Sequence, residues 1–291
     1  MTLAYPSRRL PTAAELPGSD ETPVDNQLQD DIPQLLKAVL QRIWDDRSDW
    51  FFAVDMGIYY HPDRPAIVPD AFLSIGVPRF KGVNGRLSYV LWEEENIVPI
   101  FALEVVSQTY NGEYETKLED YQDLGILYYG IYNIKAGTGR KFAQRSSLEV
   151  YKQVNGVYQR QAGNPVWMPE IGLGLGCETN SYGGWEREWL YWYTQDGDRY
   201  VSDRELRQQE REQRILSQWE TAQERQRRFM AEQETEEERQ RRFMAEQETA
   251  QERERGLRAE QEVIQEREAR LQAEQRLQEL ENRLKALGLE E

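Results

Sequence analysis

Residues 100–107, Ile-Phe-Ala-Leu-Glu-Val-Val-Ser, form an apolar run that contains a single charge, the carboxylate of Glu104. A shorter apolar run earlier in the chain, Ile67-Val68-Pro69-Asp70, ends on a second carboxylate. An ionised carboxylate taken out of water carries a large free-energy penalty unless it is paired, hydrogen-bonded or bound to a metal. Because short apolar runs are typical of buried strands, the two runs predict neighbouring strands whose acids share one divalent cation.

The sequence around these runs predicts a mixed sheet with helices packed against it, an α/β fold of the α+β kind. Apolar side chains at three- and four-residue spacing predict a helix from about Asp31 to Asp46. A second helix is predicted at residues 113–124, and Asn155-Gly156 suits the two-residue turn of a hairpin over residues 148–161. Strands are predicted at residues 50–60, 67–75, 87–92, 99–107, 126–134 and 185–194.

Two later segments could each be assigned a binding role. Residues 172–176, Gly-Leu-Gly-Leu-Gly, lack the spacing and the following helix of a phosphate-binding loop, so they predict a turn. Trp185, Trp189, Tyr191 and Tyr193 suit either a platform for stacking bases or ordinary sheet packing. Packing is the favoured interpretation.

Composition excludes several kinds of chemistry. The 291 residues carry a formal net charge of −16, which disfavours tight non-specific binding to nucleic acid because the phosphate backbone repels an anionic protein. His61 is the only histidine and Cys177 the only cysteine. Disulfide frameworks and Cys/His zinc sites are therefore excluded, and catalysis by a Ser/His or Cys/His pair is disfavoured. Carboxylate chemistry with a hard metal ion remains.

Three segments differ in composition. Residues 1–25 are rich in proline and predict an extended arm, and residues 26–202 hold the predicted α/β domain. Residues 203–291, with 18 basic and 24 acidic side chains, predict one long helix. The chain has no apolar run of the roughly 18–20 residues that span a bilayer, and residues 1–10 lack a signal-peptide core. The sequence therefore predicts a cytoplasmic protein that does not enter membranes.

The long helix contains an internal repeat. The residues from Glu224 to Thr235 return unchanged from Glu238 to Thr249, a shift of two heptads. A coiled coil with a second copy or with a partner helix is favoured over a lone solvated helix, although only one of its two seams is apolar. The apolar column is Ile215, Ala222, Phe229, Glu236, Phe243, Ala250, Leu257, Ile264 and Leu271, and the polar companion is Trp219, Gln226, Gln233, Gln240, Gln247, Glu254 and Gln261.

The two acids suit Mg²⁺, with Mn²⁺ able to substitute, because a hard cation in a phosphoryl-transfer site takes carboxylate oxygens and retains water. Asp70 and Glu104 are the candidate ligands. The backbone carbonyl of Val106 is a candidate third ligand, since Val106 shares a strand face with Glu104. Lys117 is the candidate for orienting the attacking water. In the alternative interpretation Asp70 caps a turn and Glu104 forms an ion pair with Arg79 or Lys117.

Four motifs in this order and spacing resemble a known family. They are Pro69-Asp70, residues 104–107 (Glu-Val-Val-Ser), Lys117 four residues before Tyr121, and Gly125 leading into the strand at 126–134. Over about residues 26–134 the chain resembles the restriction endonuclease family of the Uma-two type, a branch of the PD-(D/E)XK nuclease superfamily.

The resemblance implies a restriction-endonuclease-like sheet, mixed but mainly antiparallel, with Asp70 and Glu104 on adjacent strands as Mg²⁺ ligands. Val106 stands where the superfamily usually has its lysine, and Lys117 matches the helical position to which this family commonly relocates that lysine. Glu113 falls where relatives often have an acid, and we expect it to orient Lys117 four residues later.

Tyr121 falls where relatives have tyrosine, and a packing role fits it as well. The resemblance implies Mg²⁺-dependent hydrolysis of DNA phosphodiester bonds by an endonuclease. The alternative, from a different class, is a catalytically silent interaction protein that keeps the nuclease fold and assembles through a coiled coil of residues 203–291.

Overall fold

A computed structural model describes residues 5, 8–17, 26–107 and 110–287. The chain divides into two compact units, residues 1–209 and residues 210–291. Of the predicted arm, residues 1–25, only Tyr5 and residues 8–17 are described; the rest lies outside the described residues. The described part contains one 3-10 turn, η1 (Ala13–Glu15), and contacts a later segment of the same unit, where the Trp92 indole N–H donates to the Pro11 carbonyl at 2.8 Å.

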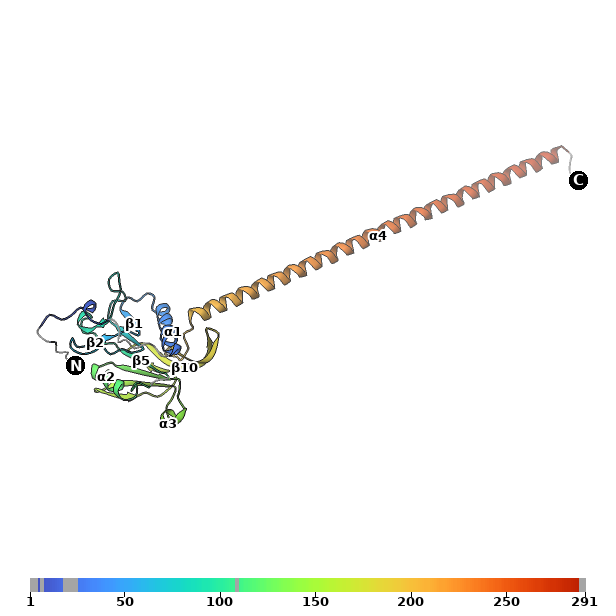
Figure 1. The fold of residues 1–291 in the computed structure, drawn as a ribbon. Helices are drawn as coiled ribbons and strands as arrows, with labels where there is room; N and C mark the ends of the chain where they lie inside the picture. The colour runs from blue at the N-terminus through green and yellow to red at the C-terminus, as the bar shows by residue number, and fades with distance from the viewer. Residues whose placement is uncertain (1–4, 6–7, 18–25, 108–109, 288–291) are drawn as a thin grey trace. The chain divides into compact units, whose positions relative to one another are not determined.

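A six-stranded mixed sheet forms the centre of the first unit (Figure 1). Its strands are β1 (Trp50–Val54), β3 (Ala71–Ile75), β5 (Phe101–Val106), β6 (Tyr128–Asn133), β7 (Leu148–Val154) and β8 (Val157–Arg160). They lie in the order β1-β3-β5-β6-β7-β8, and only β5 and β6 run parallel. This arrangement confirms the predicted mixed, mainly antiparallel sheet.

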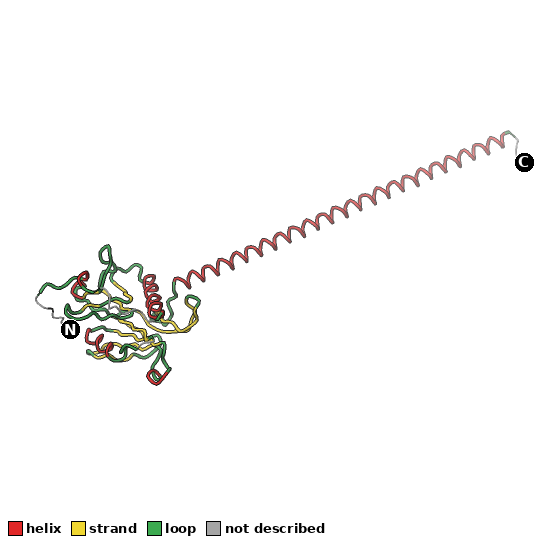
Figure 2. The backbone as a smooth tube through the Cα atoms, in the orientation of Figure 1, coloured by secondary structure: helices red, strands yellow, loops and turns green. Residues whose placement is uncertain are grey.

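The remaining elements surround this sheet (Figure 2). A three-stranded antiparallel sheet contains β9 (Val166–Met168), β10 (Leu173–Tyr182) and β11 (Trp185–Tyr193). A parallel pair contains β2 (Ile58–Tyr59) and β4 (Tyr89–Val90). The helices of the first unit are α1 (Gln27–Ile43), the 3-10 turn η2 (Leu91–Glu93), α2 (Thr116–Leu124) and α3 (Gly139–Phe142).

Each face of the central sheet has its own apolar core, and β5 contributes to both. Phe101, Leu103 and Val105 pack in the core that contains α1 and the three-stranded sheet. Ala102 and Val106 pack in the core that contains α2. Because side chains alternate along a strand, Glu104 shares the α2 face with these two residues, and all of β5 is buried.

The first helix begins earlier than predicted. α1 starts at Gln27 rather than near Asp31, because the Asn26 side chain caps it by accepting the Leu28 N–H at 2.7 Å. The apolar face is buried as the periodicity predicts, and the Trp192 indole N–H donates to the Leu36 carbonyl at 3.0 Å. The helix is thereby fixed to both sheets.

Three predicted strands are shorter than expected, and each has a local cause. The segment 50–60 breaks at Asp55, whose φ of 49° lies in the left-handed region. In segment 67–75 the strand starts only at Ala71, because Pro69 has no N–H to donate to a sheet. Segment 87–92 keeps only the two residues of β4 before it turns into η2. Asp70 therefore precedes its strand rather than lying within it.

The prediction of a turn at residues 172–176 holds only for Gly172, which has a φ of 77°; it is wrong for the rest, since residues from Leu173 onward form β10. A Cβ at Gly176 would lie 2.8 Å from the Tyr193 ring and 2.9 Å from the Pro165 Cα. Glycine is therefore required here for close packing within a strand, not for a turn. The aromatic cluster packs as favoured, with Trp189 and Tyr191 fully buried, although Trp185 is exposed.

The hairpin is confirmed. Asn155 and Gly156 join β7 to β8, and both have positive φ, 51° and 79°, as the two-residue turn requires. β8 forms the edge of the central sheet.

The predicted long helix is present as α4 (Asp203–Ala286), which has 84 residues. At its start the Ser202 hydroxyl accepts the Glu205 N–H at 3.3 Å, and the Glu205 carboxylate accepts the Ser202 N–H at 2.7 Å. This reciprocal cap satisfies two of the N–H groups that a helix start leaves without partners. In the part of the chain that the structure describes, no helix is both long enough and apolar enough to cross a bilayer.

Candidate functional site

Asp70 lies at the entrance to β3, where its backbone and side chain both join neighbouring strands. Its carbonyl accepts the Asp55 N–H at 3.1 Å, which fixes the backbone against the end of β1. Its side chain accepts the Val105 N–H of β5 at 2.6 Å. The carboxylate is thus held beside the middle of β5, and it is partly open to solvent.

Glu104 is the charged residue of β5 and is 1% exposed. Two donors from α2 reach it. The Lys117 ammonium donates to Oε2 at 2.9 Å, and the Tyr121 hydroxyl donates to Oε1 at 2.5 Å. Each carboxylate oxygen therefore has a partner, which is the condition under which a charge can be buried. Lys117 keeps a quarter of its side chain exposed, so solvent reaches the site from this side as well.

The structure thus brings Asp70, Glu104 and Lys117 together, as predicted. Burial raises the pKa of Asp70 well above its ordinary value, and the adjacent Glu104 carboxylate raises it further, although the Val105 N–H and Lys117 act in the opposite direction. Burial also raises the pKa of Glu104, against the influence of Lys117 and Tyr121. Two carboxylates side by side and largely removed from water favour added positive charge.

Lys117 responds to the same neighbours. Burial alone would lower its pKa, but the facing Glu104 and the nearby Asp70 outweigh burial, so the pKa of Lys117 lies above its ordinary value. Lys117 therefore keeps its proton at neutral pH and acts as a cation.

Tyr121 is fully buried, and its ring packs against Tyr129 at 4.9 Å between centroids. It combines the packing role with a hydrogen bond to Glu104, so the two roles considered for it coexist.

Glu113 does not orient Lys117 in the predicted way. α2 begins at Thr116, so Glu113 lies in the preceding turn and the two residues are not one helical turn apart. Its buried carboxylate instead accepts the Asn111 N–H at 3.0 and 3.1 Å through its two oxygens. Its backbone carbonyl accepts the Tyr129 hydroxyl at 2.8 Å. Glu113 therefore shapes the turn that leads into α2.

Two other residues were considered from the sequence, Val106 as a metal ligand and Arg79 as an ion-pair partner of Glu104. Val106 is buried on the same face of β5 as Glu104, as predicted, and its side chain packs in the core beside α2. Its carbonyl as a metal ligand stays a prediction. Arg79 does not pair with Glu104; it donates to the Asp45 carbonyl and lies over the Trp50 ring.

Sequence reasoning missed Gln29. This residue lies in the first turn of α1, and its side-chain amide donates to Asp70 Oδ1 at 3.5 Å. The predicted helix started two residues after Gln29, so the residue had no place in the expected fold. Asn26 was the available signal, because asparagine is among the most favoured residues immediately before a helix.

The donor set fits a hard divalent cation. Asp70, just before β3, and Glu104, on the neighbouring β5, supply carboxylate oxygens, and Mg²⁺ is commonly held by one or two carboxylates together with water. Across residues 5, 8–17, 26–107 and 110–287, no group of three or more His, Cys, Asp or Glu side chains is arranged to hold a metal ion. A cation at this site would therefore rest on two carboxylates of the described chain.

A family model matches residues 18–180 of the chain, more than half of its length. The model is that of the Uma2 family, described as "Putative restriction endonuclease". The chain belongs to this family, which confirms the resemblance drawn from the motifs around Asp70, Glu104 and Lys117.

Among solved structures, the chain is similar to one from Anabaena variabilis described as "a putative nuclease belonging to DUF820". The two share 12% sequence identity with a TM-score of 0.35, over 50% of this chain and 74% of the other. No curated protein matches the sequence.

Proposed function

We propose that this chain hydrolyses phosphodiester bonds of DNA with a divalent metal ion, Mg²⁺ or in its place Mn²⁺, held by Asp70 and Glu104. The observation that carries the proposal is the convergence of the buried Glu104 carboxylate of β5 with the part-buried Asp70 carboxylate just before β3 and with a lysine 2.9 Å from Glu104. Membership of the Uma2 family supports the reaction class. When bound, Mg²⁺ supplies Lewis-acid chemistry and a more acidic water.

The two acids have different hydrogen-bond partners, and we assign them different roles in holding the metal ion. Glu104 is held at both oxygens by α2 and presents a fixed carboxylate to the metal. Asp70 accepts the Val105 N–H at one oxygen and the longer Gln29 hydrogen bond at the other, and it is less buried than Glu104. The Val106 carbonyl is proposed as a third oxygen ligand.

Lys117 carries a proton at neutral pH, so we assign it to orienting the attacking water and to offsetting negative charge on the phosphorane-like transition state. Tyr121 holds the Glu104 carboxylate in place, and Glu113 supports the site indirectly by ordering the turn before α2. The net charge of −16 predicts weak non-specific affinity for DNA, because the phosphate backbone repels an anionic protein.

Cleavage of supercoiled plasmid tests the proposal. The full chain, Glu104→Gln and Glu94→Gln are each incubated with plasmid and Mg²⁺, Mn²⁺ or EDTA. Glu94 is the matched control because it is equally buried but is paired with Arg86 at 2.9 Å and Lys81 at 2.7 Å, not with the site.

The parent and Glu94→Gln should cut with either metal and not with EDTA. Glu104→Gln should lose more than about 100-fold in rate, because even the outer-shell partners of metal ligands are worth about 10–100-fold. Equal cleavage by the parent and Glu104→Gln would overturn the proposal. Intact plasmid in every reaction would favour the silent interaction protein.

A further inference from the structure

The second unit exposes a long apolar column that a single helix cannot cover. The large members of the column, from Phe229 to Leu271, are between 52% and 61% exposed. We call it the Phe229 column; it contains Ala222, Phe229, Glu236, Phe243, Ala250, Leu257, Ile264 and Leu271. The Gln226 column, four residues later in each heptad, contains Gln226, Gln233, Gln240, Gln247, Glu254, Gln261, Glu268 and Gln275.

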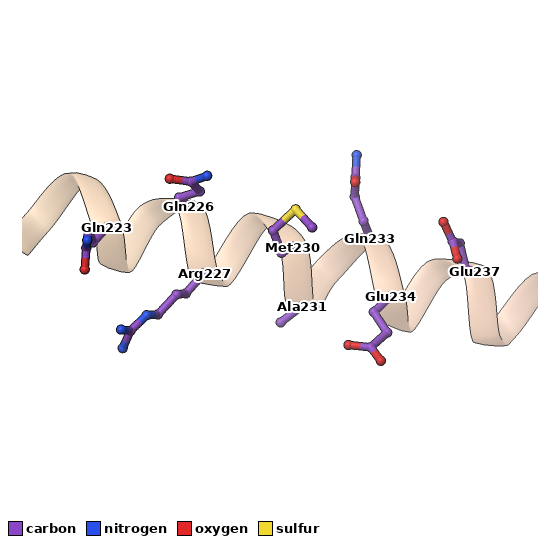
Figure 3. Close-up of a pocket in the computed structure, with 8 residues that line it drawn as sticks. All are labelled: Gln223, Gln226, Arg227, Met230, Ala231, Gln233, Glu234 and Glu237. Carbon is purple, nitrogen blue, oxygen red and sulfur yellow. The ribbon is translucent and has the colours of Figure 1, made fainter.

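Figure 3 shows part of this surface, with Gln226, Met230, Gln233 and Glu237 on one side of the helix. Gln226 and Gln233 belong to the Gln226 column, and Met230 and Glu237 each follow a member of the Phe229 column by one residue. These positions form the face that a partner helix would cover.

A third column, three residues after each member of the Phe229 column, alternates in charge at every heptad. We call it the alternating column. It flanks the seam, at the positions whose charges select the partner and its direction in coiled coils. Its eight members are Arg225, Glu232, Arg239, Glu246, Arg253, Glu260, Arg267 and Glu274.

We propose that residues 222–275 pair with the same segment of a second copy of this chain, antiparallel, about a centre near Thr249. In an antiparallel coiled coil the alternating column faces itself in reverse order, so its pairs join residues whose numbers add to 499. Because the column has eight members that alternate in charge, each Arg of one copy then faces a Glu of the other. The pairs are Arg225 with Glu274, Glu232 with Arg267, Arg239 with Glu260, and Glu246 with Arg253.

The opposite flank agrees with this register. There the antiparallel arrangement brings Glu237 of one copy against Arg258 of the other, again with opposite charges. A parallel arrangement is disfavoured by the charges of the same column. In that arrangement each member faces the residue five positions later in the partner copy. Its charged pairs are all of like sign: Glu232 with Glu237, Arg253 with Arg258, and Glu274 with Glu279.

The seam itself also favours the antiparallel direction. A parallel dimer stacks each column on its own copy, which puts Glu236, Glu254 and Glu268 each against an identical carboxylate and makes a run of Gln-on-Gln layers. An antiparallel dimer places the Gln226 column against the Phe229 column. Seven of its eight layers then contain an apolar side chain: Gln226 on Leu271, Gln233 on Ile264, Gln240 on Leu257, Gln247 on Ala250, Glu254 on Phe243, Glu268 on Phe229, and Gln275 on Ala222.

Distance measurements between single nitroxide labels on the full chain test direction and register together. Thr221→Cys and Thr249→Cys, each in a Cys177→Ala background, are a matched pair. Both threonines are exposed, lie in the same column and donate to the carbonyl four residues earlier at 2.8 Å. In the proposed dimer the two labels at 249 lie within about 30 Å, because paired helix axes are about 8–10 Å apart.

The two labels at 221 are offset by 56 residues along the dimer axis, which is about 84 Å at 1.5 Å per residue. A short distance at 249 and none at 221 is the expected result. The same short distance at both positions would overturn the proposal in favour of a parallel dimer. Analytical ultracentrifugation of the same samples measures whether the chain is a monomer or a dimer. If neither position gives a short distance, the proposal is overturned in favour of a lone helix or a different partner.

Reversing one charge is a second test, because it should change the dimer affinity in opposite directions for the antiparallel and the parallel arrangement. Glu232→Arg should weaken the proposed dimer roughly tenfold, because two opposite-charge pairs per dimer become like-charged. Adding Arg267→Glu should restore the affinity to within about twofold. In a parallel dimer Glu232→Arg would instead strengthen association, since it meets Glu237. Either that result or the absence of rescue contradicts the proposal, and neither depends on whether the first unit cleaves DNA.

Discussion

Replacing Asp70 by asparagine should stabilise the metal-free protein while it abolishes cleavage. The carboxylate lies beside Glu104 in a largely buried site, and its pKa is raised by burial and by that neighbour, so its charge opposes folding at neutral pH. Asparagine removes the charge and keeps a side-chain oxygen to accept the Val105 N–H. A residue kept for function at the expense of stability is expected to behave in this way.

The magnitude follows from what each substitution removes. Loss of the like-charge repulsion should raise the free energy of unfolding by about 1 kcal/mol, roughly the interaction energy of two unit charges about 4 Å apart in water. Asp70→Ala removes the same charge but leaves the buried Val105 N–H without its 2.6 Å acceptor, which costs about 1–3 kcal/mol. Asparagine should therefore lie above the parent in stability, and alanine at or below it.

Thermal and urea unfolding of the three proteins in EDTA at pH 7 measure these differences. For a unit of about 200 residues, 1 kcal/mol corresponds to about 2–4 °C in Tm. If Asp70→Asn is less stable than the parent, the charge of Asp70 supports the fold, and the argument that the site is built for a cation fails.

Three further predictions concern individual contacts. Tyr121→Phe should lower the free energy of unfolding by about 1.5–3 kcal/mol in urea titrations, because it takes the hydroxyl from the buried Glu104 oxygen; a neutral result would contradict this. Burial alone would raise the pKa of Glu94, but the hydrogen bonds from Arg86 and Lys81 outweigh it and the pKa is lowered. The stability that Glu94 contributes is thus present above pH 4.5 and is lost as the pH falls through its folded pKa. The difference in unfolding free energy between the parent and Glu94→Gln should therefore shrink on acidification. A difference that does not depend on pH would refute the assignment. Gly176→Ala should cost about 1–3 kcal/mol through overpacking, measured by thermal unfolding, and equal stability of parent and variant would argue against the close packing.

The sequence carried enough information to locate the site because its signals are local and strong. Glu104 is one charge in a buried run, and its neighbours alternate between two cores as strand geometry dictates. Lys117 and Tyr121 are spaced so that one face of a helix presents both to that charge. These three residues converge in the structure as their spacing predicts.

The parts that failed depend on contacts between distant segments. Gln29 reaches Asp70 only because α1 starts early, and the strand content of residues 173–176 depends on Tyr193 and Pro165 lying against bare glycine. Glu113 was expected on α2, but its carboxylate satisfies an N–H in the turn before the helix. Spacing along one element cannot reveal such contacts, because they are fixed by tertiary packing.

Titration calorimetry with Mn²⁺ tests the central claim most directly. The parent and the matched control Glu94→Gln should each bind one Mn²⁺ per chain, and Asp70→Asn and Glu104→Gln should each lose this binding while they remain folded. No binding by the parent, or equal affinity in all four proteins, would contradict the claim that Asp70 and Glu104 together hold a catalytic cation.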